Sequence, residues 1–556
     1  MSRLDELLQQ GQQRFSQGDM AGAEQAFAAA AQLAPQAWQV HFNLGMCRDR
    51  LGRREAAFTA YEKAYQLAPD HVPCITNLAV NAFNLGKTEM ALQLTLRQVE
   101  LEPGNALAYD NLGQIFRQLG QYEGAELSLR NALLLAPDTP NLHNNLGLIL
   151  LDQNKLAEAE QAFLQALRLA PQHADAMTNL STVLQARGRT AEALEHCRRA
   201  AALVPRSAVT WTNLGNVLKS MGLHQEALEA QRQAIALAPD YALAHWNYAM
   251  SLLALGQLEA GWQEYEWGAA AGTRTRFAAT LPRWQGEDLA GRHILLRAEQ
   301  GLGDTLQFVR FAPELQRRGA KVTLECQPSL IPLLQGVAGI DHLVAQTGEL
   351  PADAWGCQCY LPLMSLPHLL HIGLADLPGP IPYLPLEAAR VRHWQDMLGP
   401  RSRFRVGLAW AGNPRHRNDH QRSCPLAQFV ELLAVPGVEF ISLQLPAAEL
   451  PQGLRDVTAG IRDFADTAAI VSQLDLVISV DTAIIHLAGA LGRPAWLLLP
   501  RDADWRWLQE RQDSPWYPSL KLYRQKMPGQ WLPVLQSVRR DLESLAGNAR
   551  PKMQDM

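Results

Sequence analysis

Residues 479–494, "SVDTAIIHLAGALGRP", combine side chains that can hold an anion with the start of a predicted helix. An apolar run precedes Asp481 and Thr482, and His486 follows about one helical turn later. A helix that begins here presents unpaired backbone amides and the positive end of its dipole, which favour a bound phosphate. We expect Asp481, Thr482 and His486 to lie at an anion site. The alternatives are a simple helix cap, which uses the same amides, and a buried histidine that bonds locally.

A second motif, "EQGLGDTLQF" (299–308), places a carboxylate directly after an apolar segment. Gly301 and Gly303 permit a tight turn from a strand into a helix, which Asp304 and Thr305 then open. A carboxylate at this point can take the proton of an attacking hydroxyl group, so Asp304 is the predicted general base. Asp304 as a helix N-cap is the alternative. The spacing differs from GxGxxG, so it does not predict a dinucleotide site.

A third motif, "LAWAGNPRHRNDHQRSCPL" (408–426), gathers guanidinium groups in a loop behind an apolar segment. Gly412 permits close backbone approach, and Asn413 follows it. Arginine side chains bind phosphate oxygens through paired N–H groups, which assigns Arg415, Arg417 and Arg422 to a diphosphate. A solvated basic loop is the alternative.

Other residues of suitable type are discounted as metal ligands. Asp502 and Asp504 have the DxD spacing, but three loop residues outside the fold that uses this motif do not predict a metal. The seven cysteines form no CxxC pair. No metal and no cofactor are therefore predicted. The aromatic stretch 504–525 either covers a base or sugar or seals a domain edge, through Trp505, Trp507, Trp516 and Tyr517.

The elements that would position these motifs alternate between strand and helix. Strands are expected at 293–300, 321–327, 403–410, 438–445, 474–480 and 494–500, with a helix at 304–319 between the first two. Strand, helix and strand within about 35 residues imply a parallel sheet. Ligands of such sheets bind at the carboxyl ends of the strands. Two Rossmann-like halves joined by a proline-rich linker are similar to the GT-B glycosyltransferase fold.

The first half of the chain is a repeat array. Prolines recur every 34 residues from Pro35 to Pro239, and a glycine in the middle of each unit is replaced once by Asn154. Each unit predicts two helices followed by a proline that ends the second. The pattern resembles the tetratricopeptide repeat family and predicts an α-solenoid, a tetratricopeptide superhelix of about eight repeats.

An asparagine column keeps the same 34-residue register. Nothing in core packing requires asparagine there, and its amide can both donate to and accept from a peptide backbone. The column resembles the asparagine ladder of the O-linked N-acetylglucosamine transferases, which implies a groove for a protein or peptide acceptor. Its members are Asn43, Asn77, Asn111, Asn145, Asn179, Asn213 and Asn247. Hydrogen bonds between adjacent helices are the alternative role.

Residues 293–530 resemble the heptosyltransferase-like glycosyltransferases, which carry a GxGD-type turn and a D-T-x-x-x-H motif. The resemblance implies that Asp304 is the general base and that Asp481, Thr482 and His486 belong to the donor-diphosphate motif. It also places Arg422 roughly where the family has a basic residue. The residues at 413–424 and the repeats in front of the domain depart from that pattern, so an acceptor on lipopolysaccharide is not expected.

The predicted boundaries are a solenoid at 1–272, a connector at 273–292, an acceptor-side half at 293–385, a donor-side half at 400–530, a helix at 531–547 packed across both halves, and a flexible tail at 548–556. Net charge is −5, which gives no basic field for nucleic acid. There is no signal-peptide segment and no apolar run near 18 residues, so a cytoplasmic protein without a membrane span is expected.

The predicted function is inverting, metal-independent transfer of a sugar from a nucleotide-sugar to a protein or peptide. One alternative is a scaffold whose α/β part is catalytically silent. The other is a nucleotide-sugar epimerase or hydrolase, which needs no acceptor groove.

Overall fold

The computed structural model describes residues 2–277, 281–299, 301–348, 354–414, 419–445 and 449–553. The chain forms two compact units, Met1–Pro205 and Arg206–Met556. The boundary lies inside the repeat array, so the last four repeat helices belong to the same unit as the sheets. No helix within the described ranges is long and apolar enough to cross a membrane.

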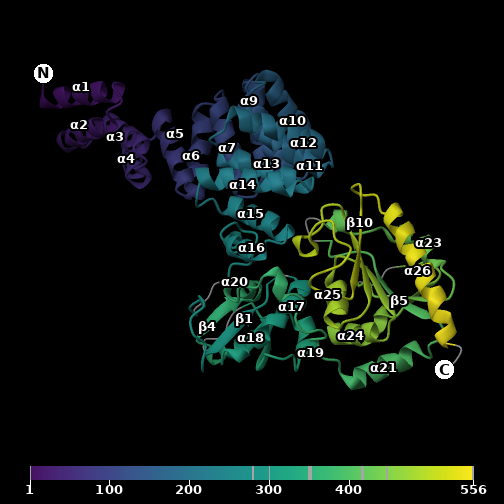
Figure 1. The fold of residues 1–556 in the computed structure, drawn as a ribbon. Coiled ribbons are helices and arrows are strands. Elements are labelled where there is room, and N and C mark those ends of the chain that lie inside the picture. Colours follow the sequence, from purple (N-terminus) through teal and green to yellow (C-terminus); the bar gives the residue numbers. More distant parts are fainter. Residues whose placement is uncertain are drawn as a thin grey trace. The chain divides into compact units, whose positions relative to one another are not determined.

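Sixteen α-helices between residues 3 and 265 form the helical pairs that the 34-residue period predicts, and each helix packs on the next one of its pair (Figure 1). The first unit contains α1 (Arg3–Ser16), α2 (Met20–Leu33), α3 (Trp38–Arg50), α4 (Arg54–Leu67), α5 (Val72–Asn84), α6 (Thr88–Leu101), α7 (Ala106–Gln118), α8 (Tyr122–Leu135), α9 (Pro140–Asp152), α10 (Leu156–Leu169), α11 (Ala174–Ala186) and α12 (Thr190–Leu203). The second unit begins with α13 (Ala208–Ser220), α14 (His224–Leu237), α15 (Ala242–Ala254) and α16 (Leu258–Tyr265).

The turn inside each pair explains the recurring glycine. Gly52, Gly86 and their equivalents adopt a φ near +70°, which side chains disfavour. Asn154, the one replacement, adopts a φ of 59°, and asparagine tolerates this left-handed conformation better than most residues. A second column, Ala23, Ala57, Ala91, Ala125, Ala159, Ala193 and Ala227, is 0% exposed throughout. Small buried residues at one register allow the helices to pack closely.

Ion pairs add a repeated link between neighbouring pairs of the first unit. Glu126 of α8 accepts from Lys155, which precedes α10, and Glu160 of α10 accepts from Arg189, which precedes α12. The interval is 29 residues in both cases. In the same register the Lys87 ammonium lies 3.5 Å from the centre of the Phe58 ring. The starts of α6, α10 and α12 are thus tied to the repeat before each of them.

Two parallel sheets follow the repeats in the second unit. The first has the order β3-β2-β1-β4 and the second β10-β9-β8-β5-β6-β7. The strands are β1 (His293–Arg297), β2 (Lys321–Cys326), β3 (His342–Ala345), β4 (Cys359–Pro362), β5 (Phe404–Ala409), β6 (Val438–Ser442), β7 (Leu454–Asp456), β8 (Leu476–Val480), β9 (Ala495–Leu499) and β10 (Leu520–Arg524). All six expected strands are present. The sequence interpretation missed β3, β4, β7 and β10, which are short or only partly buried.

Helices connect the strands. They are α17 (Leu302–Phe308), α18 (Ala312–Arg317), α19 (Ile331–Leu334), α20 (Leu366–Leu369), α21 (Ala388–Leu398), α22 (Asp419–Arg422), α23 (Val430–Leu433), α24 (Phe464–Ser472), α25 (Ala483–Ala490) and α26 (Leu532–Met553). The single helix expected at 304–319 is divided into α17 and α18 by a 3₁₀ turn. Pro313, which lacks a backbone N–H, stands at the start of α18.

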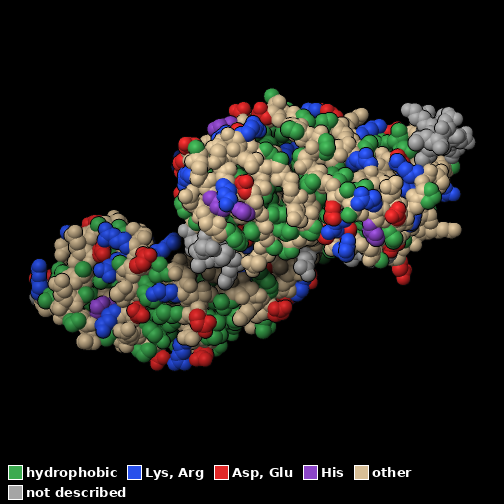
Figure 2. Space-filling model, turned by 90° about the horizontal axis from the view of Figure 1, so that it is seen from below, with side chains coloured by type: hydrophobic (Ala, Val, Ile, Leu, Met, Phe, Trp, Pro, Cys, Tyr) green, Lys and Arg blue, Asp and Glu red, His purple; other side chains and the backbone are tan. Residues whose placement is uncertain are grey.

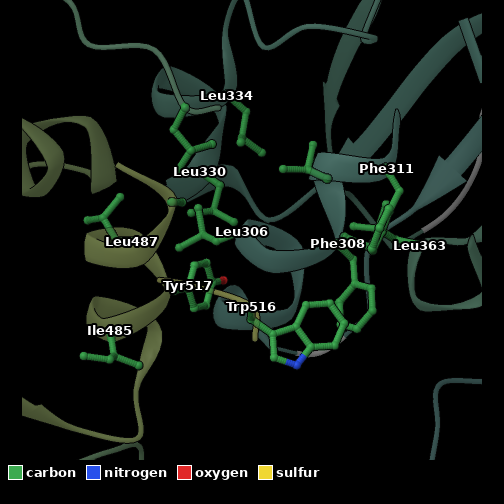
Figure 3. Close-up of a cluster of buried hydrophobic side chains, with 14 of the residues drawn as sticks. Leu306, Phe308, Phe311, Leu330, Leu334, Leu363, Ile485, Leu487, Trp516 and Tyr517 are labelled. Carbon is green, nitrogen blue, oxygen red and sulfur yellow. The ribbon is translucent and has the colours of Figure 1, made fainter. Parts of the chain in front are cut away.

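One hydrophobic cluster joins both sheets and the last repeat pair. Figure 3 shows side chains of α17, such as Leu306 and Phe308, pointing toward Leu487 of α25 and toward Trp516 and Tyr517. Trp262 of α16 is 1% exposed, and its ring lies edge-on to Trp505 at 5.2 Å between centroids. The last repeat pair is therefore part of the core of the α/β unit.

The C-terminal helix α26 packs differently from the prediction. Its buried residues, including Val538 and Leu542, join a cluster formed with β5, β6, β8 and β9 of the second sheet. Helix α26 contacts β10 and α23, and Figure 1 draws it along the second sheet. The expectation that it packs across both halves is wrong, because its apolar face is already covered by one sheet.

Candidate functional site

The starts of α17 and α25 meet, which brings together two motifs far apart in the sequence. Gly303 of α17 lies so close to His486 of α25 that an added Cβ would be 2.7 Å from the His486 Cδ2 atom. Both helices follow parallel strands, β1 and β8, at their carboxyl ends. A glycine is needed at 303 because any side chain there would overlap the histidine. The predicted proximity of the two motifs is therefore present.

Asp304, the predicted general base, faces this meeting point and is held by an arginine. Its Oδ1 atom accepts from Nη2 of Arg506 at 2.5 Å, and its side chain is 28% exposed. Burial raises the pKa of Asp304, and Asp504 and Glu299 add to the rise, while Arg506 and Arg274 oppose it. The N-cap of α17 is Gly301, so Asp304 lies inside the first turn of the helix. The N-cap alternative for Asp304 is thus wrong.

Asp481 lies just before α25 among groups from three segments. Burial raises the pKa of Asp481 to about 6, nearby Asp504 adds to the rise, and Trp507, Arg506 and Arg422 oppose it. Its Oδ1 atom is 4.0 Å from Nε2 of His486, too far for a hydrogen bond. The side chain is 15% exposed. A carboxylate in such surroundings can bind a proton near neutral pH.

Thr482 and His486 have defined partners. Thr482 is the N-cap of α25, because its Oγ1 accepts from the Ile484 amide at 3.3 Å. His486 Nδ1 lies 3.1 Å from the Tyr517 hydroxyl. Burial, with Arg506 and Arg310 nearby, holds the pKa of His486 well below its usual value, so the imidazole is neutral at pH 7. The cap and the locally bonded histidine, both considered from sequence, are present.

The arginine-rich loop is only partly within the described ranges. Arg415 and Arg417 lie outside the described residues. Arg422 is paired with Asp419, from Nε to Oδ1 at 3.1 Å, and is close enough to lower the pKa of Asp481. A Cβ added at Gly412 would be 2.6 Å from Arg422 Nη2, so this glycine leaves room for the guanidinium. Asn413, by contrast, is exposed.

Two groups of predicted residues turn inward. Thr305 is fully buried and bonds Gln327 at 2.9 Å, so it supports the turn and does not line the site. Trp505, Trp507, Trp516 and Tyr517 are all nearly or fully buried. Their rings pack on α16, α17 and α25, which supports the alternative that they seal a domain edge.

The residue that sequence reasoning missed is Arg506. It stands in the 3₁₀ turn η9 (Trp505–Trp507), between two tryptophans of the aromatic stretch 504–525. An arginine between aromatic residues that are expected to be buried needs acidic partners. This requirement was the sequence signal that could have identified Arg506. It donates to Asp304, Asp504 and Gln307.

The asparagine column is half-buried over most of its length. Asn145 Nδ2 donates to Asp110 at 2.9 Å, and Asn179 Nδ2 donates to Asn144 at 2.9 Å, each bond reaching the preceding repeat. These two residues make the inter-helix bonds of the alternative role. Asn247 is 6% exposed, and its Nδ2 atom has no hydrogen-bond partner among the residues that the structure describes. The peptide-groove role stays a prediction for the column.

Neither of two surface pockets lies at the meeting point of α17 and α25. One, of about 470 Å³, is lined by Gln428 and residues 529–533, and another, of about 350 Å³, lies on α3 and α4. Within the described ranges, no group of three or more His, Cys, Asp or Glu side chains is arranged to hold a metal ion. Acidic and basic side chains are interspersed on the face drawn in Figure 2.

Comparison with known proteins supports the repeats. A family model described as the Cilia and flagella-associated protein 70 C-terminal domain matches residues 2–251. Protein FlbA of Caulobacter vibrioides is 28% identical over 331 residues, which are 54% of this chain and 55% of that protein. The chain thus spans about half the length of this curated relative.

Solved structures of repeat proteins are also similar. A tetratricopeptide repeat protein from Parabacteroides merdae is 18% identical, with a TM-score of 0.42, and covers 45% of this chain and 98% of its own. YrrB, titled a TPR protein with an unusual peptide-binding site, is 24% identical, with a TM-score of 0.27, and covers 33% and 95%. The matched family model and the observed paired helices agree that residues 2–251 form tetratricopeptide-type repeats, and a C-terminal α/β region of two parallel sheets follows them.

Proposed function

We propose that the α/β region is a GT-B glycosyltransferase similar to the heptosyltransferases. It would transfer a sugar from a nucleotide-sugar, with inversion and without a metal or cofactor, to a protein or peptide held by repeats of the O-linked N-acetylglucosamine transferase kind. The observation that carries this proposal is the meeting of α17 and α25, marked by the contact of Gly303 with His486. It puts a partly exposed carboxylate opposite a helix start at the carboxyl ends of strands in two parallel sheets.

In the proposed step the acceptor hydroxyl oxygen attacks the anomeric carbon of the sugar. The bond from that carbon to the diphosphate oxygen breaks, and the nucleoside diphosphate leaves with the electron pair. The hydroxyl proton passes to Asp304, whose pKa is raised toward a range useful for a base. Charge grows on the leaving diphosphate, so fixed amides at the start of α25 and the Arg422 guanidinium would stabilise the transition state.

The repeats supply the acceptor side of the proposal. Tetratricopeptide folds bind peptides or proteins along their repeats. Helix α15, the first helix of the last repeat pair, packs directly on the 3₁₀ turn η9. This turn carries Arg506, which donates a hydrogen bond to Asp304. An acceptor lying on α13 and α15 would therefore approach the candidate base.

Binding of nucleoside diphosphates tests the donor side. The full chain is heated with UDP, GDP, ADP and CDP in turn, each against its nucleoside. We expect one diphosphate, and not its nucleoside, to raise the melting temperature, because a ligand that binds the folded state at about 100 times its Kd stabilises it by about 2.7 kcal/mol.

Arg422→Gln should remove most of that rise, since it deletes the guanidinium nearest to Asp481 among the described loop residues. Arg401→Gln is the matched control. It removes the same charge from a pair with Asp475, which lies at the opposite, amino end of β5 and β8. Silence of the wild-type chain across the panel would favour the scaffold instead.

A further inference from the structure

One side chain, Arg506, ties the candidate base to several other elements. Its Nη2 atom donates to Asp304 at 2.5 Å, Nη1 donates to Asp504 at 2.8 Å, and Nε donates to Gln307 at 2.8 Å. Arg506 follows β9 of the second sheet, while Asp304 and Gln307 lie on α17 beside the first sheet. The guanidinium therefore fixes α17 to the second half of the α/β region.

The surroundings of Arg506 make these bonds strong and specific. The side chain is 9% exposed, and its guanidinium lies 4.3 Å from the centre of the Trp505 ring and 5.8 Å from that of Phe308. Aromatic rings favour the flat guanidinium, and the fork of N–H groups matches several acceptors at once. A lysine has one point charge and cannot make the same set of bonds.

The last repeat pair supports η9 from the other side. Helix α15 packs on η9, and the Trp505 ring lies 5.2 Å from Trp262 and 6.4 Å from Tyr265 of α16. Gln307 is fully buried, and Arg506 is bonded to its side-chain oxygen. The orientation of the guanidinium is thus set by α15, α16 and α17 together.

We propose that Arg506 is a positioning residue, which holds the Asp304 carboxylate in place to receive the proton of the acceptor hydroxyl. This role rests on the proposed glycosyl transfer. Arg506 itself would touch neither the acceptor hydroxyl nor the anomeric carbon. It acts by holding Asp304, and its hydrogen bond links this carboxylate to η9, on which α15 of the last repeat pair packs.

Several titratable groups surround Asp304 besides Arg506. They are Glu299 after β1, Asp504 before η9, Arg274, Tyr265 of α16, and His486 of α25, which lies against Gly303. Asp481 shares the neighbours Asp504 and Arg506 with Asp304. Arg274 is engaged by Glu299 at 2.8 Å, and His486 is neutral, so Arg506 is the cation that acts most directly on Asp304. Its removal should raise the pKa of Asp304 further, because an adjacent positive charge favours the ionised carboxylate.

The test compares Arg506→Gln with Arg506→Lys in two measurements. In the first, transfer rate is measured against pH. Loss of the cation lowers the ionised fraction of Asp304 at a given pH, so the acidic limb of the Arg506→Gln profile should move about 1–3 units to higher pH. Arg506→Lys should keep the limb near its wild-type position at a lower maximal rate, since it keeps the charge and loses the fork.

Arg310→Gln is the matched control. This buried arginine also joins the two halves, but its hydrogen bonds go to the carbonyl oxygens of Gln307, Pro378 and Trp516 and to the Tyr383 hydroxyl. It should lower stability while leaving the acidic limb in place. A limb that is unmoved in Arg506→Gln, or moved equally in Arg310→Gln, would overturn the positioning role.

The second measurement does not depend on transfer. The carboxyl carbon of Asp304 is followed by NMR against pH in the wild-type chain, in Arg506→Gln and in Arg506→Lys, with Asp304→Asn to assign the signal. If the wild type turns over no nucleotide-sugar, the proposed function fails. The titration still shows whether Arg506 is paired with Asp304 and lowers the pKa of its carboxyl group. A titration of Asp304 that is the same in Arg506→Gln and in the wild type would refute the pairing itself.

Discussion

At the scale of single residues, the candidate site contains carboxyl groups whose surroundings disfavour the ionised form. Asp481 and Asp304 both have raised pKa values because burial outweighs the two arginines that act on each carboxyl group. Structural ion pairs elsewhere in the chain behave in the opposite way. The pKa of Asp466, which Arg462 and Arg390 contact, is about 2. Groups held at a cost to stability are the ones expected at functional sites.

Asp481→Asn should therefore stabilise the ligand-free chain at pH 8. The pKa of this carboxyl is 3.8 in an ordinary setting and about 6 here, so its ionised form opposes folding above pH 6. The neutral amide relieves that cost, by about 1–3 kcal/mol at 1.36 kcal/mol for each unit. Urea unfolding at pH 8 and at pH 4 measures the difference.

The gain should shrink as pH falls through 6 and should vanish below 3.8, where the wild-type carboxyl is protonated in both states. Asp475→Asn, at the amino ends of the strands, serves as the control, because Asp475 is paired with Arg401 and should lose stability on substitution. An Asp481→Asn chain that is less stable than the wild type at pH 8 would contradict this account of the site.

Much of the site was predictable from residue type and spacing. Asp304, Asp481, Thr482 and His486 were placed at strand ends by local pattern, whereas the contact of Gly303 with His486 joins two distant segments and was not encoded locally. Arg506 was not predicted, because its partners Asp304 and Gln307 are about 200 positions away in the sequence. Contacts of that kind depend on how the two sheets pack, and no local pattern encodes them.

At the scale of elements, period and apolar runs predicted the helices and the central strands. β1, β2, β5, β6, β8 and β9 are buried runs that the sequence shows directly. β3 and β7 were missed because they are short edge strands with partly exposed residues. The single helix expected at 304–319 was interrupted by a 3₁₀ turn, which a window of apolar residues cannot resolve.

The last repeat pair should prove necessary for the α/β region to fold. A fragment that begins at residue 273, the end of the array by sequence period, lacks Trp262 and Tyr265, which are 1% and 5% exposed. Loss of one such tryptophan alone costs about 3–5 kcal/mol, against a typical total stability of about 5–15 kcal/mol. We expect this fragment to bind a dye for exposed apolar surface and to lose its near-UV circular dichroism.

A fragment that begins at residue 206 provides the comparison, since it matches the second compact unit. It should unfold in one cooperative transition on heating. Cooperative unfolding of both fragments at the same temperature would mean that α15 and α16 are dispensable for the α/β region.

At the scale of the whole molecule, the chain combines helical repeats with two parallel sheets, and the last repeat pair belongs to the core of the sheets. The proposed function needs both the repeats and the sheets. The repeats would select an acceptor, and the site between α17 and α25 would carry out the transfer. The net charge of −5 and the interspersed charges on the face drawn in Figure 2 give no reason to expect a nucleic acid partner.

Mass spectrometry of cellular glycoproteins tests the central claim of glycosyl transfer most directly. Peptides are compared between cells with the wild-type chain, cells without it, and cells with Asp304→Asn at equal abundance. We predict that one class of sugar-modified peptides is lost both without the chain and in Asp304→Asn, since general-base catalysis contributes about 10²–10⁴-fold to rate. An identical set of modified peptides in all three would contradict the account.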